Sequence, residues 1–172
     1  MSTLITNTLQ GINTIKYDAS TTAMTIDSSG NVNMPQVLTS KAVAFSVYHN
    51  SAGSINASAS YVKIPYAIAN IDTHSAFNFS SDHYVVPVAG VYVFEMSVLQ
   101  LGSMSSNIAF HLNGTEKLPQ YRAITGTTEQ NVTGSIILDC AVNDTVDVRI
   151  RTTSGGGTYY RTHGGFHGHL IG

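Results

Sequence analysis

The clearest pattern in the chain runs through residues 82–98, where large apolar side chains recur at every second position. After Gly90, one face of an extended strand carries Tyr92, Phe94, Met96 and Val98, and the other carries Val91, Val93, Glu95 and Ser97. Period two is the signature of a half-buried β-strand. Pro87 cannot donate to a sheet, and Gly90 can take the backbone angles of a corner. The stretch therefore predicts a strand, a corner and a second strand.

Short strands of the same kind are expected throughout residues 42–172. They are predicted at residues 44–48, 61–66, 76–79, 108–112, 135–142, 146–151 and 165–171, with loops at 51–60 and 70–75. Asn113-Gly114 and Asn143-Asp144 are turn signals between neighbouring strands. No stretch has a convincing helical pattern. Many short strands separated by turns predict an all-β sandwich or barrel.

The predicted core faces of three later strands follow from the same alternation. They carry Ile108, Phe110 and Leu112; Ile136, Leu138 and Cys140; and Val146, Val148 and Ile150. Asp147, Arg149 and Arg151 are then expected to face outward.

Residues 1–41 differ from the rest, because they hold only short alternating pieces, at residues 4–9, 23–26 and 31–34. A turn signal at residues 27–31 separates two of the pieces. Each piece is too short to build a core alone, so we expect them to pair between chains or to lie on another protein. A flexible leader is the alternative that the composition allows. We therefore divide the chain into a segment, 1–41, and a head, 42–172.

Composition narrows the function classes. Only 10% of the 172 residues are charged, against about 25% in ordinary globular proteins. The net charge is −2 without a Lys/Arg cluster, which argues against nucleic-acid binding. No apolar stretch is long enough to cross a bilayer, and the first residues do not resemble a secretion signal. The single cysteine, Cys140, excludes an intramolecular disulfide, and we expect synthesis in a reducing cytoplasm.

The block Pro-Val-Ala-Gly-Val-Tyr-Val-Phe at residues 87–94 resembles the most recognisable part of the complement C1q globular head. Further similar stretches are residues 44–47, 107–114, 134–139, 143–148 and 166–171. The C1q head is a trimeric jelly roll related to tumour necrosis factor. The resemblance therefore implies a homotrimeric jelly-roll β-sandwich. Two features depart from the family: Asn143 replaces a usual glycine, and no collagen-like repeat precedes the head.

The first residues, Met-Ser-Thr-Leu-Ile-Thr-Asn-Thr, and residues 24–32 resemble the N-termini of small bacteriophage virion proteins. This resemblance implies a non-enzymatic virion protein, made in the host cytoplasm. We expect a trimeric fibre or fibre-tip module that binds a host-surface glycan or protein, and whose residues 1–41 attach to other virion proteins. The alternative is a capsid decoration or cement protein that staples neighbouring capsid subunits. A secreted bacterial adhesin or glycan-binding module is a further alternative, against which the missing signal counts.

His167 and His169 are the candidate metal ligands among the seven histidines. Residues i and i+2 share a strand face, so their rings are expected to point together. The C1q resemblance places the closing strand near the threefold axis, where six imidazoles would suit a transition metal. The alternative is an exposed or interfacial pair without metal, because no carboxylate or cysteine completes a familiar ligand set. No other cofactor is expected.

An enzyme is not expected. The sequence has no Gly-x-Ser-x-Gly elbow and no phosphate-binding loop, and Cys140 lies on an apolar strand face. Tyrosine and arginine are enriched at binding hot spots. The candidate ligand-binding residues are therefore Tyr121, Arg122, Tyr159, Tyr160 and Arg161. The alternative is that these side chains serve ordinary loop or subunit packing.

Overall fold

The computed structural model divides the chain into two compact units, Met1–Lys41 and Ala42–Gly172. It describes residues 14–16, 22–30, 32–33, 42–49, 53–55, 58–102, 104–124, 129–155, 157–159 and 164–171. These residues form strands and turns, and none of them belongs to a helix. Consequently the described part contains no helix that could cross a membrane. The predicted all-β class is confirmed.

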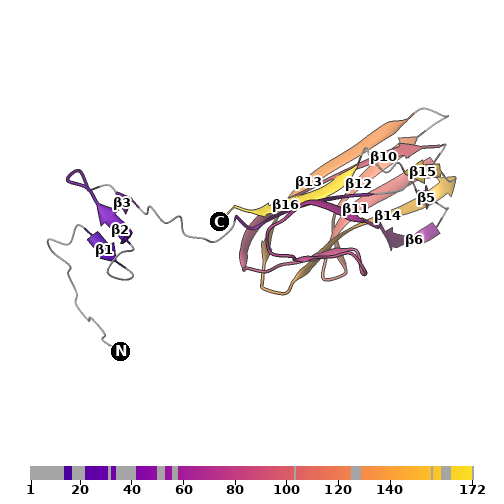
Figure 1. Cartoon of the computed structure of the whole chain (residues 1–172). Helices are drawn as coiled ribbons and strands as arrows, with labels where there is room; N and C mark the ends of the chain where they lie inside the picture. Colours follow the sequence, from indigo (N-terminus) through magenta and orange to yellow (C-terminus); the bar gives the residue numbers. More distant parts are fainter. Residues whose placement is uncertain are drawn as a thin grey trace. The chain divides into compact units, whose positions relative to one another are not determined.

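The first unit contains one small antiparallel sheet in the order β1-β2-β3 (Figure 1). Its strands are β1 (Thr14–Lys16), β2 (Thr22–Ile26) and β3 (Val32–Asn33). The predicted turn between β2 and β3 is confirmed: the Gly30 N–H donates to the Asp27 carbonyl at 3.0 Å, and the Ser29 N–H donates to the Asp27 carboxylate at 2.8 Å. The short pieces thus pair within one chain, which the sequence analysis did not consider. The piece predicted at residues 4–9 lies outside the described residues.

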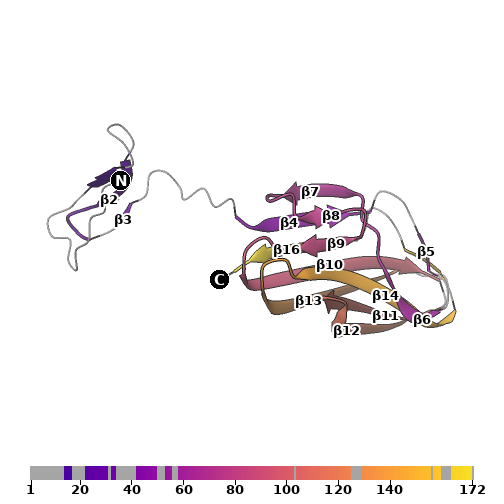
Figure 2. The same cartoon turned by 90° about the horizontal axis from the view of Figure 1, so that it is seen from below.

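The head contains a seven-stranded antiparallel sheet in the order β5-β15-β10-β16-β4-β7, with β13 on the other side of β10 (Figure 2). Its strands are β4 (Ala44–Tyr48), β5 (Gly53–Ile55), β7 (Ile68–Asp72), β10 (Gly90–Leu101), β13 (Gln130–Cys140), β15 (Gly157–Tyr159) and β16 (Gly165–Leu170). The strand predicted from the strongest alternation, β10, is central. It pairs with β13 along one edge and with β16 and then β15 along the other.

A six-stranded sheet forms the second layer, in the order β12-β11-β14-β9-β8, with β6 also paired to β14. Its strands are β6 (Ser58–Lys63), β8 (Phe77–Asn78), β9 (His83–Val85), β11 (Met104–Leu112), β12 (Thr115–Ile124) and β14 (Thr145–Gly155). The turn between β11 and β12 is the predicted Asn-Gly hairpin, in which Asn113 and Gly114 have φ angles of 51° and 78°. Both central residues therefore adopt the positive φ that such a turn requires.

Aromatic rings from both sheets meet in one core. Phe45 of β4 stacks on Tyr84 of β9 with ring centroids 4.0 Å apart, and Phe166 of β16 meets Phe45 edge-on at 4.8 Å. Tyr92 and Phe94 of β10 are completely buried beside them, as the alternation predicted. Tyr92 also donates from its hydroxyl to the Val88 carbonyl at 2.6 Å, so the ring is buried without leaving its polar atom unpaired.

Two predicted loops contain strands. Part of the loop predicted at residues 70–75 belongs to β7, and the loop predicted at 51–60 contains β5 and the start of β6. Strand β7 buries almost none of its side chains, so it shows no alternation of apolar and polar residues that the sequence could reveal. Its conformation comes from hydrogen bonds to β4, which depend on tertiary structure.

Replacing Phe94 by alanine is expected to lower the free energy of unfolding by about 3–5 kcal/mol, because a fully buried ring is lost and a cavity remains. Urea unfolding of the two proteins measures the difference. Phe79→Ala is the matched control, since Phe79 is exposed and should cost much less. Equal losses for the two variants would contradict the assigned core face of β10.

Candidate functional site

One candidate interaction surface is the outer face of the seven-stranded sheet, which we define as the side of β4, β16, β10 and β13 that points away from the core. Strand register places its side chains in rows. One row runs through Ser46, His167, Glu95 and Ser135, and the next runs through Ala44, His169, Val93 and Ile137. The predicted pair of histidines therefore lies on this face.

The His167 ring is directed towards Gly165 and Ser46. His167 is half-buried, and its Nδ1 lies 2.9 Å from the Ser46 hydroxyl. Its ring lies over Gly165, with ring atoms 2.8 and 2.9 Å from the position that a Cβ on Gly165 would take. Because Gly165 and His169 lie on opposite sides of His167 along the strand, the ring leans away from His169. The missing side chain at Gly165 and the bond to Ser46 explain this orientation.

Glu95 is the acidic neighbour of His167, a pairing that the sequence pattern did not predict. It lies directly opposite His167 in the ladder between β10 and β16. Burial lowers the pKa of His167, and the negative charge of Glu95 partly opposes that effect. Only the register of two strands far apart in sequence brings them together, so no local motif could have predicted the pair.

Metal binding by His167 and His169 stays a prediction. Within the part of the chain that the structure describes, no three His, Cys, Asp or Glu side chains gather closely enough to hold a metal ion.

The outer face mixes exposed apolar side chains with polar ones, and it also exposes the carboxylates of Glu95 and Asp139. Ile137 is 64% exposed and Ile71 is also exposed, while Val91 and Val93 are half-buried. None of the strands of this sheet contains a lysine or an arginine. An exposed apolar surface with so few ions is typical of a protein interface.

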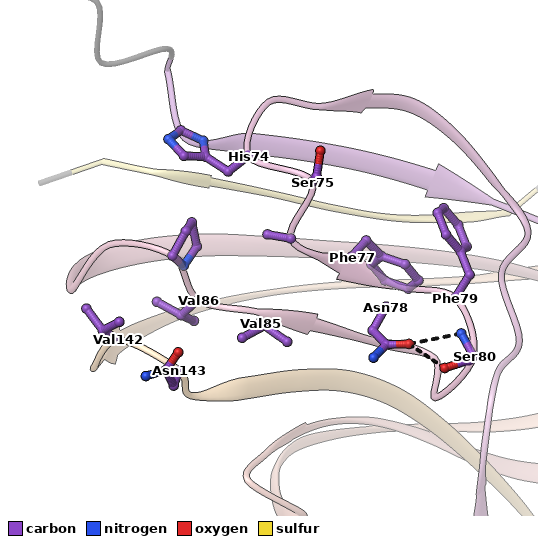
Figure 3. A pocket seen from close by; sticks show the side chains of 12 residues that line it. His74, Ser75, Phe77, Asn78, Phe79, Ser80, Val85, Val86, Val142 and Asn143 are labelled. Atoms are coloured by element: carbon purple, nitrogen blue, oxygen red, sulfur yellow. Dashed lines mark hydrogen bonds between the residues drawn. The ribbon is translucent and has the colours of Figure 1, made fainter.

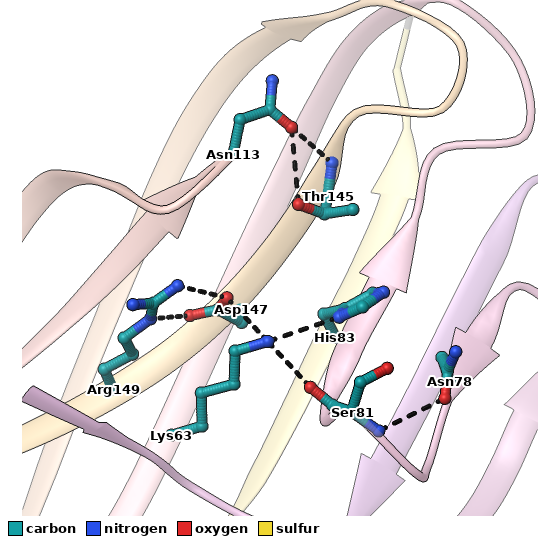
Figure 4. Close-up of polar contacts among 8 residues, drawn as sticks. All are labelled: Lys63, Asn78, Ser81, His83, Asn113, Thr145, Asp147 and Arg149. Carbon is teal, nitrogen blue, oxygen red and sulfur yellow. Dashed lines mark hydrogen bonds and ion pairs between the residues drawn. The ribbon is translucent and has the colours of Figure 1, made fainter.

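The outer face of the six-stranded sheet carries a charged network instead (Figure 4). The carboxylate of Asp147, only 2% exposed, accepts two hydrogen bonds from the guanidinium of Arg149 and lies 3.3 Å from the Lys63 ammonium. Lys63 also donates to the Ser81 carbonyl at 2.7 Å, so it links β6, β14 and the turn before β9. Asp147 points out of the core as predicted, but its own cationic neighbours cover it.

The predicted ligand-binding residues whose backbone the structure describes lie on strands of both sheets of the head. Tyr121 and Arg122 lie in β12 of the six-stranded sheet, whereas Tyr159 lies in β15 of the seven-stranded sheet. Tyr160 and Arg161 lie outside the described residues, as do the side chains of the other three. Ligand binding by these five residues stays a prediction.

Cys140 is placed as the sequence analysis expected, on the buried face of β13. Burial raises the pKa of its thiol to about 11, and the Asp144 and Asp139 carboxylates add to the effect. A thiol with such a pKa is protonated at neutral pH and is a poor nucleophile.

A groove lies at one end of the head, between the turn that follows β7 and the turn between β13 and β14 (Figure 3). Its volume is about 540 Å³. It is lined by His74, Ser75, Ala76, Phe77, Asn78, Phe79, Ser80, Val85, Val86, Pro87, Val142 and Asn143. The lining contains no aspartate, glutamate, lysine or arginine, so the groove suits an uncharged group. We call it the basal groove.

Comparison with known proteins agrees with this architecture. The sequence profile of the C1q domain matches residues 44–171, which is most of the chain. The chain belongs to the C1q domain family. C1q and tumour-necrosis-factor domains are typically homotrimeric and are generally not enzymes. A search of curated proteins finds no match.

Solved structures of two such domains are similar to the head. The globular domain of zebrafish complement 1qA protein has a TM-score of 0.60 and 18% sequence identity, covering 75% of this chain and 97% of that chain. The tumour necrosis factor Eiger from S. frugiperda has a TM-score of 0.61 and 14% identity, covering 76% of this chain and 93% of that chain. These similarities confirm the predicted jelly roll.

Lowering the pH from 7.5 to 5 is expected to destabilise the head, because burial lowers the pKa values of His49, His111 and His167. The folded head then binds fewer protons than the unfolded chain below about pH 6.5, so stability falls as the pH drops through that value. Urea unfolding across this range measures the slope. His167→Gln should make the slope shallower. An unchanged slope in this variant would contradict a buried, neutral His167.

Asp147→Asn is expected to lower the free energy of unfolding by about 1.5–3 kcal/mol, because Arg149 and Lys63 lose hydrogen bonds to a charged partner. Asp139→Asn changes the same charge on an exposed side chain and should cost less than about 0.5 kcal/mol. Thermal or urea unfolding distinguishes the two. If Asp147→Asn leaves the free energy of unfolding unchanged, the charged network contributes little to stability.

Proposed function

We propose that this chain is a non-enzymatic, homotrimeric structural protein of a bacteriophage particle. In this proposal the trimeric head is displayed as a fibre or fibre-tip module that binds a host-surface glycan or protein. Residues 1–41 attach it to other virion proteins. The observation that carries the trimer in this proposal is the set of exposed apolar side chains on the outer face of the seven-stranded sheet, Ile137 and Ile71 among them, which a single head leaves in water.

Trimer formation is supported by the chemistry of that face and by the family. Ile137 and Ile71 lie on β13 and β7, at opposite edges of the same sheet. A closed ring of three copies uses two different patches of each copy, so one edge can pack against the neighbour's other edge. Each Å² of apolar surface that leaves water contributes about 25 cal/mol. Glu95 and Asp139 are acidic groups that such an interface must accommodate.

The virion context is supported by the resemblance of residues 1–8 and 24–32 to phage virion N-termini. The head has its own aromatic core, whereas the described residues of the first unit form three short strands. A small sheet of this kind gains little by packing on itself but can add strands to the sheet edge of a neighbouring protein. Residues 1–41 are therefore the proposed anchor, and the head is the displayed part.

Sedimentation of the purified chain at micromolar concentration is expected to give the mass of three copies. Ile137→Asp should shift it towards monomer, because three carboxylates would be buried in the interface. Val62→Asp is the control, since Val62 is 59% exposed on the other sheet, and it should remain trimeric. A stable monomer of the unmodified chain would overturn the trimer.

Attachment is tested by adding purified protein to particles that lack it. The full chain should bind, and residues 42–172 alone should fold and trimerise but remain unbound. If the isolated head binds as well as the full chain, the capsid decoration reading replaces the displayed fibre. If neither binds, the virion assignment is wrong.

A further inference from the structure

Several segments of the head converge at one end, the end at which the chain arrives from residues 1–41. The Thr73 hydroxyl donates to the Ala42 carbonyl at 2.7 Å, and the Leu170 N–H donates to the Val43 carbonyl at 3.0 Å. The Ile171 N–H in turn donates to the Val91 carbonyl at 2.8 Å. In Figure 1 the last strand, β16, ends beside the point where the chain reaches the head. We call this end the base of the head.

The turn between β13 and β14 belongs to the same end. Gly90 at the start of β10 pairs with Cys140 at the end of β13. The Val86 N–H donates to the Asp144 carbonyl at 2.8 Å, and the Asn143 N–H donates to the Val86 carbonyl at 2.9 Å. The basal groove lies between this turn and the turn that follows Thr73. The groove is therefore part of the base.

Apolar side chains are exposed at the base, where turns normally carry polar residues. Val88 is 40% exposed, Val142 is 50% exposed and Ile171 is 52% exposed. Val142 also forms part of the wall of the basal groove, and Phe79 is exposed farther along it (Figure 3). These side chains make a surface that is costly to leave in water and that suits contact with another protein.

The carboxylates at the base are already satisfied within the head. Asp72 accepts from the N–H groups of Ala76 and Phe77, both at 2.9 Å. Asp144 accepts from the Asn113 amide and the Ala141 N–H, both at 2.8 Å. A covering protein can desolvate such groups without leaving them unpaired. Asp139 is the exposed carboxylate nearest to this surface, one residue before Cys140 on β13.

The covalent connection between residues 1–41 and Ala42 indicates which protein this surface contacts. Whatever residues 1–41 bind is tethered to the base through the chain itself, which raises its effective concentration there. A surface that is too small to bind this partner alone can then still strengthen the attachment.

We propose that the base of the head is a second docking surface for the same virion protein that residues 1–41 bind. The partner presents an apolar, uncharged surface there, and one of its apolar side chains occupies the basal groove. This inference rests on the proposed attachment through residues 1–41. The opposite end of the head is then left to face the host.

The experiment measures binding of full-length variants to particles that lack the protein. Val142→Asp places a charge in the wall of the groove at a turn position that accepts aspartate, and Ile171→Asp does the same at a separate point of the base. Each should weaken binding at least tenfold. Val62→Asp adds an identical charge to an exposed valine outside the base and should bind like the unmodified chain. Sedimentation and circular dichroism establish that all variants keep the fold and subunit number of the unmodified chain.

The outcomes separate this inference from the proposed function. If the unmodified chain does not bind the particles, the virion assignment fails. If it binds and both base variants bind equally well, residues 1–41 attach alone and the docking surface is wrong. If Val62→Asp weakens binding as much as the base variants do, the effect is a general one of added charge, and the docking surface is also wrong. The proposal is supported if Val142→Asp and Ile171→Asp weaken binding and Val62→Asp does not.

Discussion

The head depends on the close approach of its two sheets around one group of aromatic rings. The tightest contact is the stack of Phe45 on Tyr84, which joins β4 of one sheet to β9 of the other. Gly168 of β16 leaves the space beside this stack that the rings of Phe45 and Phe94 fill, because a Cβ at that position would lie 2.6 Å from ring atoms of both. Real structures essentially never contain such contacts, so another residue at 168 would force the rings apart.

The same glycine fixes where the histidines go. Side chains alternate along β16. Because residue 168 packs against the aromatic rings of the core, residues 167 and 169 point to the outer face. A requirement of the core thus decides the chemistry of the surface. The small residue at 165 has a second effect, since it leaves the space over which the His167 ring lies.

Sequence alone predicted the features that depend on local pattern. Period-two alternation identified β10 and its buried face, and Asn-Gly identified the hairpin between β11 and β12. Strand β7 was missed because it has little burial to impose a pattern. The facing pair of Glu95 and His167 was missed for a different reason, since it depends on the register of the closing strand. The direction of the His167 ring depends on Ser46, which belongs to a third strand.

The two sheets divide the charge of the head between them. Lysine and arginine are absent from the strands of the seven-stranded sheet, whereas Lys63, Arg149 and Arg151 lie on neighbouring strands of the six-stranded sheet. A sheet face without lysine or arginine and with few carboxylates costs less to bury than one with many ions, whereas a charged face favours solubility. The two sides of the head therefore differ in the cost of covering them with another protein.

The position of Cys140 has a consequence for the durability of the assembled protein. Its thiol is buried and stays protonated at neutral pH, so it neither forms the thiolate that oxidants attack nor reaches a cysteine of another copy. Copies of the head are therefore not expected to form disulfide crosslinks through this residue, even in an oxidising solution.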